Sequence, residues 1–494
     1  MWATALRIRT ATIGSLNSMQ NWIRSARNDI VVTSALFCAC YLIFVLLWPS
    51  YYDTMSPDSG GYLEFSPLRT TFYPVFLAAL KAAGLSIPKI VTVQLTISAF
   101  ALFFCVVALR RSGGPLWLAG LFVLLQAHPY FSSYHHVIQA ESLYFSGTYL
   151  LIAALLEFFK RQRIVDLAWA SLSIGILIGI RPAAVVLLPM LPLAYWIARR
   201  PVTARALVVF VAMVIPASAA ILLDRVVHMS VHRLAATDTE IYSYMSYTML
   251  AQSAMLVRSD MKYDGPSAAQ FASIGSRLSK VYEPVHAYLD NMPALPARAV
   301  IEASYENAAL FHVMAGDIKN AAAAAGITES TFRKEFAKQV FVQNPDGLIK
   351  LVMTHYLGYW SLVAPNFPPF AKSINAYSKS FGTIPLTEFV KEDIYFPKAS
   401  LFSIPNFLPA IFAGIGTLFL AIYFVIMLIR GGATSTNLLV VAGFFSVMCQ
   451  IYIGGISVMT AAQPRYFFAI YPQLTLIGIL CLQRLTAIAA QKRA

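Results

Sequence analysis

Charged residues are scarce in this chain of 494 residues. Asp, Glu, Lys and Arg make up only 12% of it, whereas they make up roughly 25% of a soluble globular domain. Apolar residues make up 58% of the chain, although disordered chains are poor in them and rich in charge. These proportions exclude both an ordinary soluble protein and a disordered one.

Cysteines are few, and the common catalytic motifs are absent. The sequence has no H-E-x-x-H pair or Cys/His cluster, no G-x-x-x-x-G-K-[ST] loop and no G-x-S-x-G elbow. Catalytic zinc, nucleoside triphosphate hydrolysis and serine hydrolysis are therefore not expected. The five cysteines lie in or beside apolar runs, where they are interpreted as small packing residues: Cys38, Cys40, Cys105, Cys449 and Cys481.

Carboxylates are missing from the middle of every long apolar run. Proton- and ion-coupled transporters usually keep acids or broken helices at mid-membrane, so this absence weighs against that class. The polar side chains gather instead at the predicted outer interface, and all eight histidines lie on the outer side: His128, His135, His136, His228, His232, His286, His312 and His355.

The apolar residues that are present form about ten runs. A helix needs about 20 apolar residues to cross a hydrocarbon core of roughly 30 Å. The runs therefore predict an all-α polytopic membrane protein with about ten transmembrane helices, at residues 30–48, 90–109, 115–125, 137–159, 165–180, 183–198, 206–223, 404–429, 438–459 and 467–482.

Basic residues follow every second run, which is the positive-inside pattern. The pattern predicts cytoplasmic termini and places Arg110, Arg161, Arg200 and Arg430 inside. The cytoplasmic segments hold sixteen Lys/Arg and three Asp/Glu, so topology explains nearly all of the net charge of +14. No nucleic-acid partner is needed.

The spans divide the chain into four parts. These are a cytoplasmic segment 1–29, a transmembrane region 30–223, an extracytoplasmic domain 224–403 and a C-terminal part 404–494 with a short cytoplasmic tail. The domain 224–403 balances sixteen Lys/Arg with sixteen Asp/Glu, as a water-exposed domain should. It is predicted to be mostly helical, at 268–289, 297–325, 330–342 and 348–363.

The first outer loop, 49–89, contains Ser56-Pro57-Asp58-Ser59-Gly60-Gly61-Tyr62-Leu63, followed by Arg69 and by Tyr73-Pro74. The proline and glycines predict a turn that presents the Asp58 carboxylate to the interface. On the local residues alone, the favoured interpretation of Asp58 is an Asx-turn or a cap on a short helix at Gly60. Residues 72–80 are predicted to lie along the interface as an amphipathic helix.

Three further motifs lie at predicted outer positions: His135-His136-Val137-Ile138-Gln139-Ala140-Glu141-Ser142, Gly179-Ile180-Arg181-Pro182 and Gln463-Pro464-Arg465-Tyr466. Together with the Asp58 loop, they resemble the motifs of the GT-C superfamily of polytopic glycosyltransferases. The resemblance covers the membrane region, and the domain 224–403 does not align by eye to any subfamily.

The resemblance implies an inverting transfer of a sugar from a polyprenyl-phosphate carrier to a glycan, lipid or protein acceptor. The site would face outward from the bacterial cytoplasmic membrane. Asp58 would be the general base, and Arg181, Arg465 and Arg69 would bind the donor phosphate. The remaining side chains would orient substrates: Glu141, Tyr62, His135, His136 and His355.

Several assignments have alternatives. Glu141 could instead pair with Arg181 inside the bundle, and the aromatic residues around His355 could be interfacial anchors. No cofactor is expected: some members of the superfamily use a divalent metal, but Asp58 and Glu141 are the only acids that could meet on this side. The competing functions are a translocator of lipid-linked sugar or polysaccharide that makes no bond, and a ligase or polymerase of the same fold.

Overall fold

The computed structural model describes residues 27–47, 54–56, 58–198, 206–232, 244–290, 298–299, 302, 315–361, 399–460 and 464–492. Within these residues every regular element is a helix. The predicted all-α class is therefore confirmed for the described part of the chain.

Within the described part of the chain, seven helices are long and apolar enough to cross a membrane. They are Arg27–Leu47, α4 (Ile87–Arg111), α7 (Glu141–Arg161), α10 (Ala206–His232), α18 (Ala399–Ile429), α19 (Leu438–Met459) and α21 (Tyr471–Gln491). Shorter apolar helices cover three of the other predicted spans: α5 (Leu116–Gln126), α8 (Ile164–Ile180) and α9 (Met190–Ala198), the last preceded by η2 (Pro182–Leu187).

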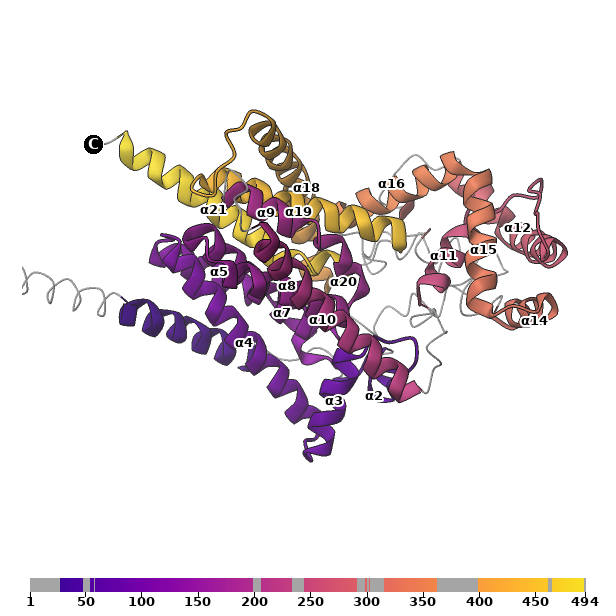
Figure 1. Ribbon diagram of the computed structural model, residues 1–494, viewed down its shortest axis with the longest axis horizontal. Coiled ribbons are helices and arrows are strands. Elements are labelled where there is room, and N and C mark those ends of the chain that lie inside the picture. The colour runs from indigo at the N-terminus through magenta and orange to yellow at the C-terminus, as the bar shows by residue number, and fades with distance from the viewer. Residues whose placement is uncertain are drawn as a thin grey trace, which may run out of the picture.

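The long helices form one bundle around α7 and α8 (Figure 1). Apolar side chains on the outer helices remain exposed, among them Leu207 and Phe419, as expected of surfaces that face lipid. Where α8 meets α10, a Cβ at Gly175 would lie 2.8 Å from the Cα of Ala217. Small residues thus let these two backbones approach closely, which is typical of membrane helix contacts.

Two predicted helix boundaries are wrong in ways that matter for the site. α7 begins at Glu141, not at residue 137, because the amide of Ile138 donates to the Thr54 carbonyl at 2.9 Å. Glu141 is therefore the first residue of its helix rather than a turn inside it. The last span begins at Tyr471, with Pro472 in its first turn, and the motif arginine and tyrosine lie on a separate helix, α20 (Pro464–Phe468).

Beyond α10 the chain forms a group of helices that we call the helical domain, residues 244–361. It contains α11 (Tyr244–Ala254), α12 (Ala268–Asp290), α14 (Ala315–Ala325), α15 (Glu329–Gln343) and α16 (Pro345–Ser361). The predicted helices at 268–289, 330–342 and 348–363 match α12, α15 and α16 closely, and α11 was not predicted. Residues 297–325 were predicted as one helix, of which 300–301 and 303–314 lie outside the described residues.

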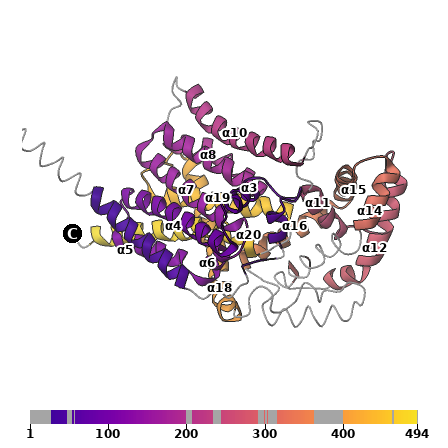
Figure 2. The same ribbon diagram turned by 90° about the horizontal axis from the view of Figure 1, so that it is seen from below.

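The helical domain has its own core and lies at one end of the bundle (Figures 1 and 2). Phe271, Phe332 and Phe336 are at most 3% exposed and pack together in this core. α16 joins the domain to the bundle: Trp360 packs edge-on against Phe467 at 5.8 Å, and its ring faces Gly414 of α18. Trp360 is one of the aromatic residues around His355 that could have been interfacial anchors, and it packs against the bundle instead.

The opposite end of the bundle carries basic residues. Arg111, at the end of α4, and Arg161, at the end of α7, both pair with Glu157, at 3.0 and 2.6 Å. The C-terminus also lies at the end away from α11–α16 (Figure 1). Basic residues from alternate predicted connections thus share one end of the bundle. That this end is cytoplasmic stays a prediction.

Candidate functional site

The residues 54–72 tie three of the sequence motifs together. The Ser59 hydroxyl donates to the Ile138 carbonyl at 2.8 Å, which joins the Asp58 loop to the loop before α7. The Thr70 hydroxyl donates to the Ile180 carbonyl at 2.8 Å, directly before Arg181. The Thr71 amide donates to Asp224 of α10 at 2.9 Å. The predicted outer motifs therefore meet at the end of the bundle that carries the helical domain.

Asp58 precedes the short helix α2 (Ser59–Leu63), but its side chain makes no capping bond to that helix. Its Oδ1 instead accepts a hydrogen bond from Nη2 of Arg69 at 2.7 Å, and the two side chains are 28% and 23% exposed. The guanidinium lies 4.6 Å from the centre of the Tyr62 ring. A Cβ at Gly61 would come within 3.1 Å of Arg69 Nε, so the glycine makes room for this side chain.

Glu141 and Arg181 form a second ion pair, which is buried. The exposed fractions of the two side chains are 2% and 10%. Glu141 lies in the first turn of α7, where the helix dipole favours a carboxylate. Its Oε2 is buried and has no hydrogen-bond partner among the described residues. The pairing that the sequence left as an alternative is thus present, and it leaves one carboxylate oxygen unsatisfied.

Tyr62 connects the two ion pairs. The side chain is only 7% exposed and packs edge-on against Tyr73 at 5.0 Å. Burial raises the pKa of Tyr62 to about 12; nearby Glu141 and Asp58 also raise this pKa, while Arg69 and Arg181 lower it. All four charged groups therefore lie near enough to the Tyr62 phenol to affect its pKa.

Aromatic residues of the C-terminal part complete this region. The guanidinium of Arg181 lies 4.8 Å from the ring centre of Tyr466, and Tyr466 meets Tyr359 of α16 edge-on at 6.4 Å. Tyr466 is part of the motif that contains Arg465, but no role at the site was predicted for it. The side chain of Arg465 itself lies outside the described residues, so its predicted contact with phosphate stays a prediction.

The three histidines predicted to orient substrates lie in different surroundings. Both ring nitrogens of His135 are used, with the hydroxyls of Ser142 at 2.8 Å and Ser98 at 3.3 Å. Burial lowers the pKa of His135 to about 3, so the ring is neutral. This geometry favours a structural role that fastens the loop to α4 and α7.

His136 and His355 are also buried. Burial lowers the pKa of His136, whose ring bonds the backbone of Val45; its Nε2 has no partner within the described residues. His355 is fully buried in α16 and belongs to the contact between the helical domain and α19. Its Nε2 lies 3.9 Å from Glu302 of the helical domain. These contacts place His355 between the helical domain and α19.

The described residues contain no group of three or more His, Cys, Asp or Glu side chains that could hold a metal ion. The chemistry of the candidate site therefore depends on the two ion pairs. Their two carboxylates can accept protons, and their two guanidinium groups can bind an oxyanion bidentately. Such a set can deprotonate a hydroxyl and stabilise a departing phosphate. It is electrically balanced before a substrate arrives.

Comparison with known proteins gives no match to a family model, a curated protein or a solved structure. The resemblance of the motifs to the GT-C superfamily therefore stays a prediction. The structure brings the segments of three of these motifs into contact: Ser59 bonds to Ile138, 79 positions away, and Thr70 to Ile180, 110 positions away.

Proposed function

We propose that the chain is an integral membrane glycosyltransferase that moves a sugar from a polyprenyl-phosphate carrier to an extracytoplasmic acceptor. The observation that supports this most is the presence of two carboxylate–arginine contacts, Asp58–Arg69 and Glu141–Arg181, whose charges all act on Tyr62. Hydrogen bonds from Ser59 and Thr70 hold the loop of Asp58 against the start of α7 and the end of α8, beside apolar helices. A lipid-linked donor requires this combination of a polar site and a lipid-facing wall.

Asp58 is the general base in this proposal. Its carboxylate is partly exposed, at 28%, so an acceptor hydroxyl can reach it without breaking the core. The acceptor oxygen attacks the anomeric carbon, the bond from that carbon to the phosphate oxygen breaks, and the proton moves to Asp58. Polyprenyl phosphate leaves with the electron pair. A positioned base of this kind contributes about 10² to 10⁴ in rate.

Arg181 stabilises the leaving phosphate. Its guanidinium is held between Glu141 and the Tyr466 ring, which fixes its plane and lowers the entropy cost of binding a phosphate. When phosphate binds, it competes with Glu141 for the guanidinium. The Glu141 carboxylate, with its unsatisfied Oε2, is then available to accept a hydrogen bond from a sugar hydroxyl.

The test is transfer of labelled sugar from a polyprenyl-phosphate hexose by the purified full chain in lipid nanodiscs. We expect Asp58→Asn to lower turnover by at least about 100-fold while the protein stays folded. Glu64→Gln is the matched control, because Glu64 is an exposed carboxylate of the same loop with no ion pair among the described contacts. Equal activity of Asp58→Asn and the wild type would remove Asp58 from the mechanism.

Arg181→Lys separates the transferase from a translocator. Lysine keeps the charge but loses the planar fork, and phosphate charge is greatest as the sugar leaves. A transferase should lose more single-turnover rate than donor affinity. A translocator needs only the ground-state phosphate, so its affinity and its rate of flux across a proteoliposome membrane should fall together. Absence of transfer by the wild type with any polyprenyl-phosphate sugar would favour the translocator.

A further inference from the structure

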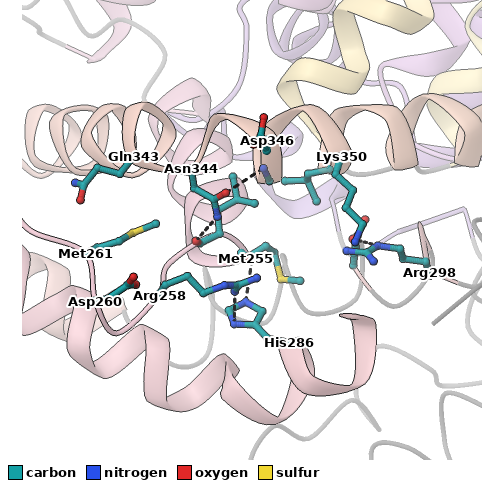
Figure 3. A pocket seen from close by; sticks show the side chains of 14 residues that line it. Met255, Arg258, Asp260, Met261, His286, Arg298, Gln343, Asn344, Asp346 and Lys350 are labelled. Atoms are coloured by element: carbon teal, nitrogen blue, oxygen red, sulfur yellow. Dashed lines mark hydrogen bonds and ion pairs between the residues drawn. The ribbon is translucent and has the colours of Figure 1, made fainter. Parts of the chain in front are cut away.

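The helical domain contains a cavity of about 480 Å³ that lies apart from the two ion pairs. It is formed where the end of α11 and the following loop meet α12 and the junction between α15 and α16 (Figure 3). Pockets for small molecules usually measure about 300 to 1,000 Å³. The cavity is therefore large enough for a sugar-sized ligand and much larger than an inorganic anion.

Two amide side chains keep the walls of this cavity in place. Asn344 Nδ2 donates to the Leu256 carbonyl at 3.0 Å, and its Oδ1 accepts the Gly347 amide at 3.0 Å. Gln343 Nε2 donates to the Lys262 carbonyl at 2.6 Å, and its Oε1 accepts the amide of the same residue at 3.0 Å. These bonds clamp the loop after α11 to the α15–α16 junction, so the cavity is preformed.

Three cationic side chains approach the cavity from different sides: Lys350 from α16, Arg298 from the opposite wall and Arg258 from the loop after α11 (Figure 3). Arg258 Nη1 lies 2.5 Å from Nδ1 of His286, whose Nε2 contacts the Met255 carbonyl at 2.8 Å. Because Nε2 must donate to a carbonyl, Nδ1 accepts and the imidazole is neutral. It orients Arg258 without compensating its charge.

Three carboxylates also line the cavity: Asp260, Glu302 and Asp346. Glu302 is 1% exposed and pairs with Arg298 at 2.7 Å. Asp346 points away from the three cations, and Asp260 lies on the side of Arg258 away from Arg298 and Lys350 (Figure 3). Among the described residues, no carboxylate lies within ion-pair distance of Arg258 or Lys350. Arg298 is therefore already paired, and Glu302 also lies near enough to Lys350 to be affected by its charge. Arg258 and Lys350 are the two cations of the lining that remain available to an anion.

We propose that this cavity is a binding site for an anionic sugar, a hexose-sized group that carries a phosphate or a carboxylate. Arg258 can bind the oxyanion through its guanidinium, and Lys350 adds a point charge, whereas Arg298 is already paired with Glu302. Met255, Leu256 and Leu351 provide an apolar wall for the carbon skeleton. The proposal does not depend on the transferase activity of the bundle.

The test is isothermal titration calorimetry of the purified full chain in nanodiscs of neutral lipid at pH 7. Glucose 6-phosphate and glucuronate are the anionic probes, glucose is the neutral probe, and inorganic phosphate tests the anion alone. We expect both anionic sugars to bind at least about tenfold more tightly than glucose and than inorganic phosphate. Nanodiscs that contain phosphatidylglycerol should not reduce this binding.

Variants assign the heat to the cavity. Lys350→Gln and Arg258→Gln should each weaken the binding of glucose 6-phosphate at least about tenfold, and Lys350→Arg should restore it to within about threefold of the wild type. Lys338→Gln is the matched control, since Lys338 is an exposed lysine of α15 that does not line the cavity. Thermal unfolding checks that each variant is folded, and Lys350 is exposed, so its removal should leave the fold intact.

Each other outcome overturns the proposal. Equal affinity for glucose and glucose 6-phosphate would show that charge plays no part. Inorganic phosphate that binds as tightly as the sugar phosphate would reduce the site to a simple anion site. Competition by phosphatidylglycerol would reassign it to a lipid headgroup. Unchanged binding in Lys350→Gln would show that the ligand does not bind in the cavity. No heat with either anionic sugar at concentrations up to about 100 μM would show that the cavity does not bind such sugars.

Discussion

The two ion pairs beside Tyr62 have the same chemistry but different surroundings. Glu141 and Arg181 are 2% and 10% exposed, whereas Asp58 and Arg69 are 28% and 23% exposed. Removing one partner of a buried pair leaves a charge in a medium that cannot solvate it. An exposed pair is solvated by water when it opens. Opening the buried pair therefore costs more free energy than opening the exposed pair, and a substrate must replace the lost partner if the buried pair is to open.

The way each pair is held supports this difference. Glu141 and Arg181 lie on α7 and at the end of α8, two helices at the centre of the bundle. Asp58 and Arg69 both belong to one connecting segment, which hydrogen bonds from Ser59 and Thr70 fasten to its neighbours. Movement of that segment would alter the exposed pair without separating the two helices.

The largest effect is expected from breaking the buried pair. Arg181→Met should lower the free energy of unfolding by about 3 to 5 kcal/mol, because the Glu141 carboxylate is left buried without its partner. The measurement is thermal or denaturant unfolding of the purified protein in a fixed detergent. The double variant Glu141→Leu with Arg181→Met should recover at least half of the loss. A single variant as stable as the wild type would show that the pair is not important for the fold.

A third carboxylate–arginine pair, Arg298–Glu302 in the helical domain, extends the comparison to pH. Burial raises the pKa of Glu302 from 4.5 to about 7, and nearby Arg298 and Lys350 lower it. The contribution of Glu302 to the free energy of unfolding is therefore complete below about pH 4.5 and is lost as the pH rises to about 7. Burial lowers the pKa of His355 from 6.5 to about 4. Its contribution is complete above about pH 6.5 and is lost as the pH falls to about 4.

The contributions of Glu302 and His355 to the free energy of unfolding change with pH in opposite directions, so they should cancel between about pH 4.5 and 6.5 in the wild type. We expect His355→Gln to become less stable as the pH rises through this window, and Glu302→Gln to become less stable as the pH falls through it. Each pKa differs from its ordinary value by about 2.5, which corresponds to at most about 3 to 4 kcal/mol. Unfolding of both variants from pH 4 to 8 measures the slopes. Parallel slopes in the two variants would contradict the assignment.

A smaller effect on stability is expected where Gly179, two residues before Arg181, meets Phe72, three residues after Arg69. A Cβ at Gly179 would lie 2.5 Å from the Phe72 ring. Gly179→Ala should therefore push the Arg69 segment away from the end of α8 and cost about 1 to 3 kcal/mol. Gly478→Ala is the control, because a Cβ there meets nothing within 4 Å. Equal unfolding temperatures for the two variants would show that Phe72 moves aside without cost.

Local patterns in the sequence predicted the helices better than the contacts. Apolar runs identified the long spans, and Gly326, at a φ of +68°, ends α14 as expected. The start of α7 could not be predicted, because a hydrogen bond from Ile138 to the distant Thr54 keeps the preceding residues out of the helix.

The candidate site was predicted only in part, because its contacts also join segments that are distant in the sequence. Asp58, Arg181 and Glu141 were recognised from short motifs, and the structure brings their segments together. The contact of Asp58 with Arg69 and that of Arg181 with Tyr466 depend on how the segments pack, which no local spacing specifies. The cavity of the helical domain has no motif at all, since its three cations come from separate segments.

The smallest effect on stability is expected from the exposed pair, and it bears most directly on function. A double-mutant cycle with Asp58→Asn and Arg69→Gln should give a coupling free energy below about 1 kcal/mol. Unfolding of the two single variants, the double variant and the wild type in one detergent provides the four values. A small coupling means that a substrate hydroxyl can displace the Arg69 contact at little cost, as the role of Asp58 as a base requires. A coupling of about 3 kcal/mol or more, the size expected for buried pairs, would mean that Arg69 locks the carboxylate in place. The proton would then have to be accepted elsewhere, and the unsatisfied Oε2 of Glu141 would be the first alternative to test.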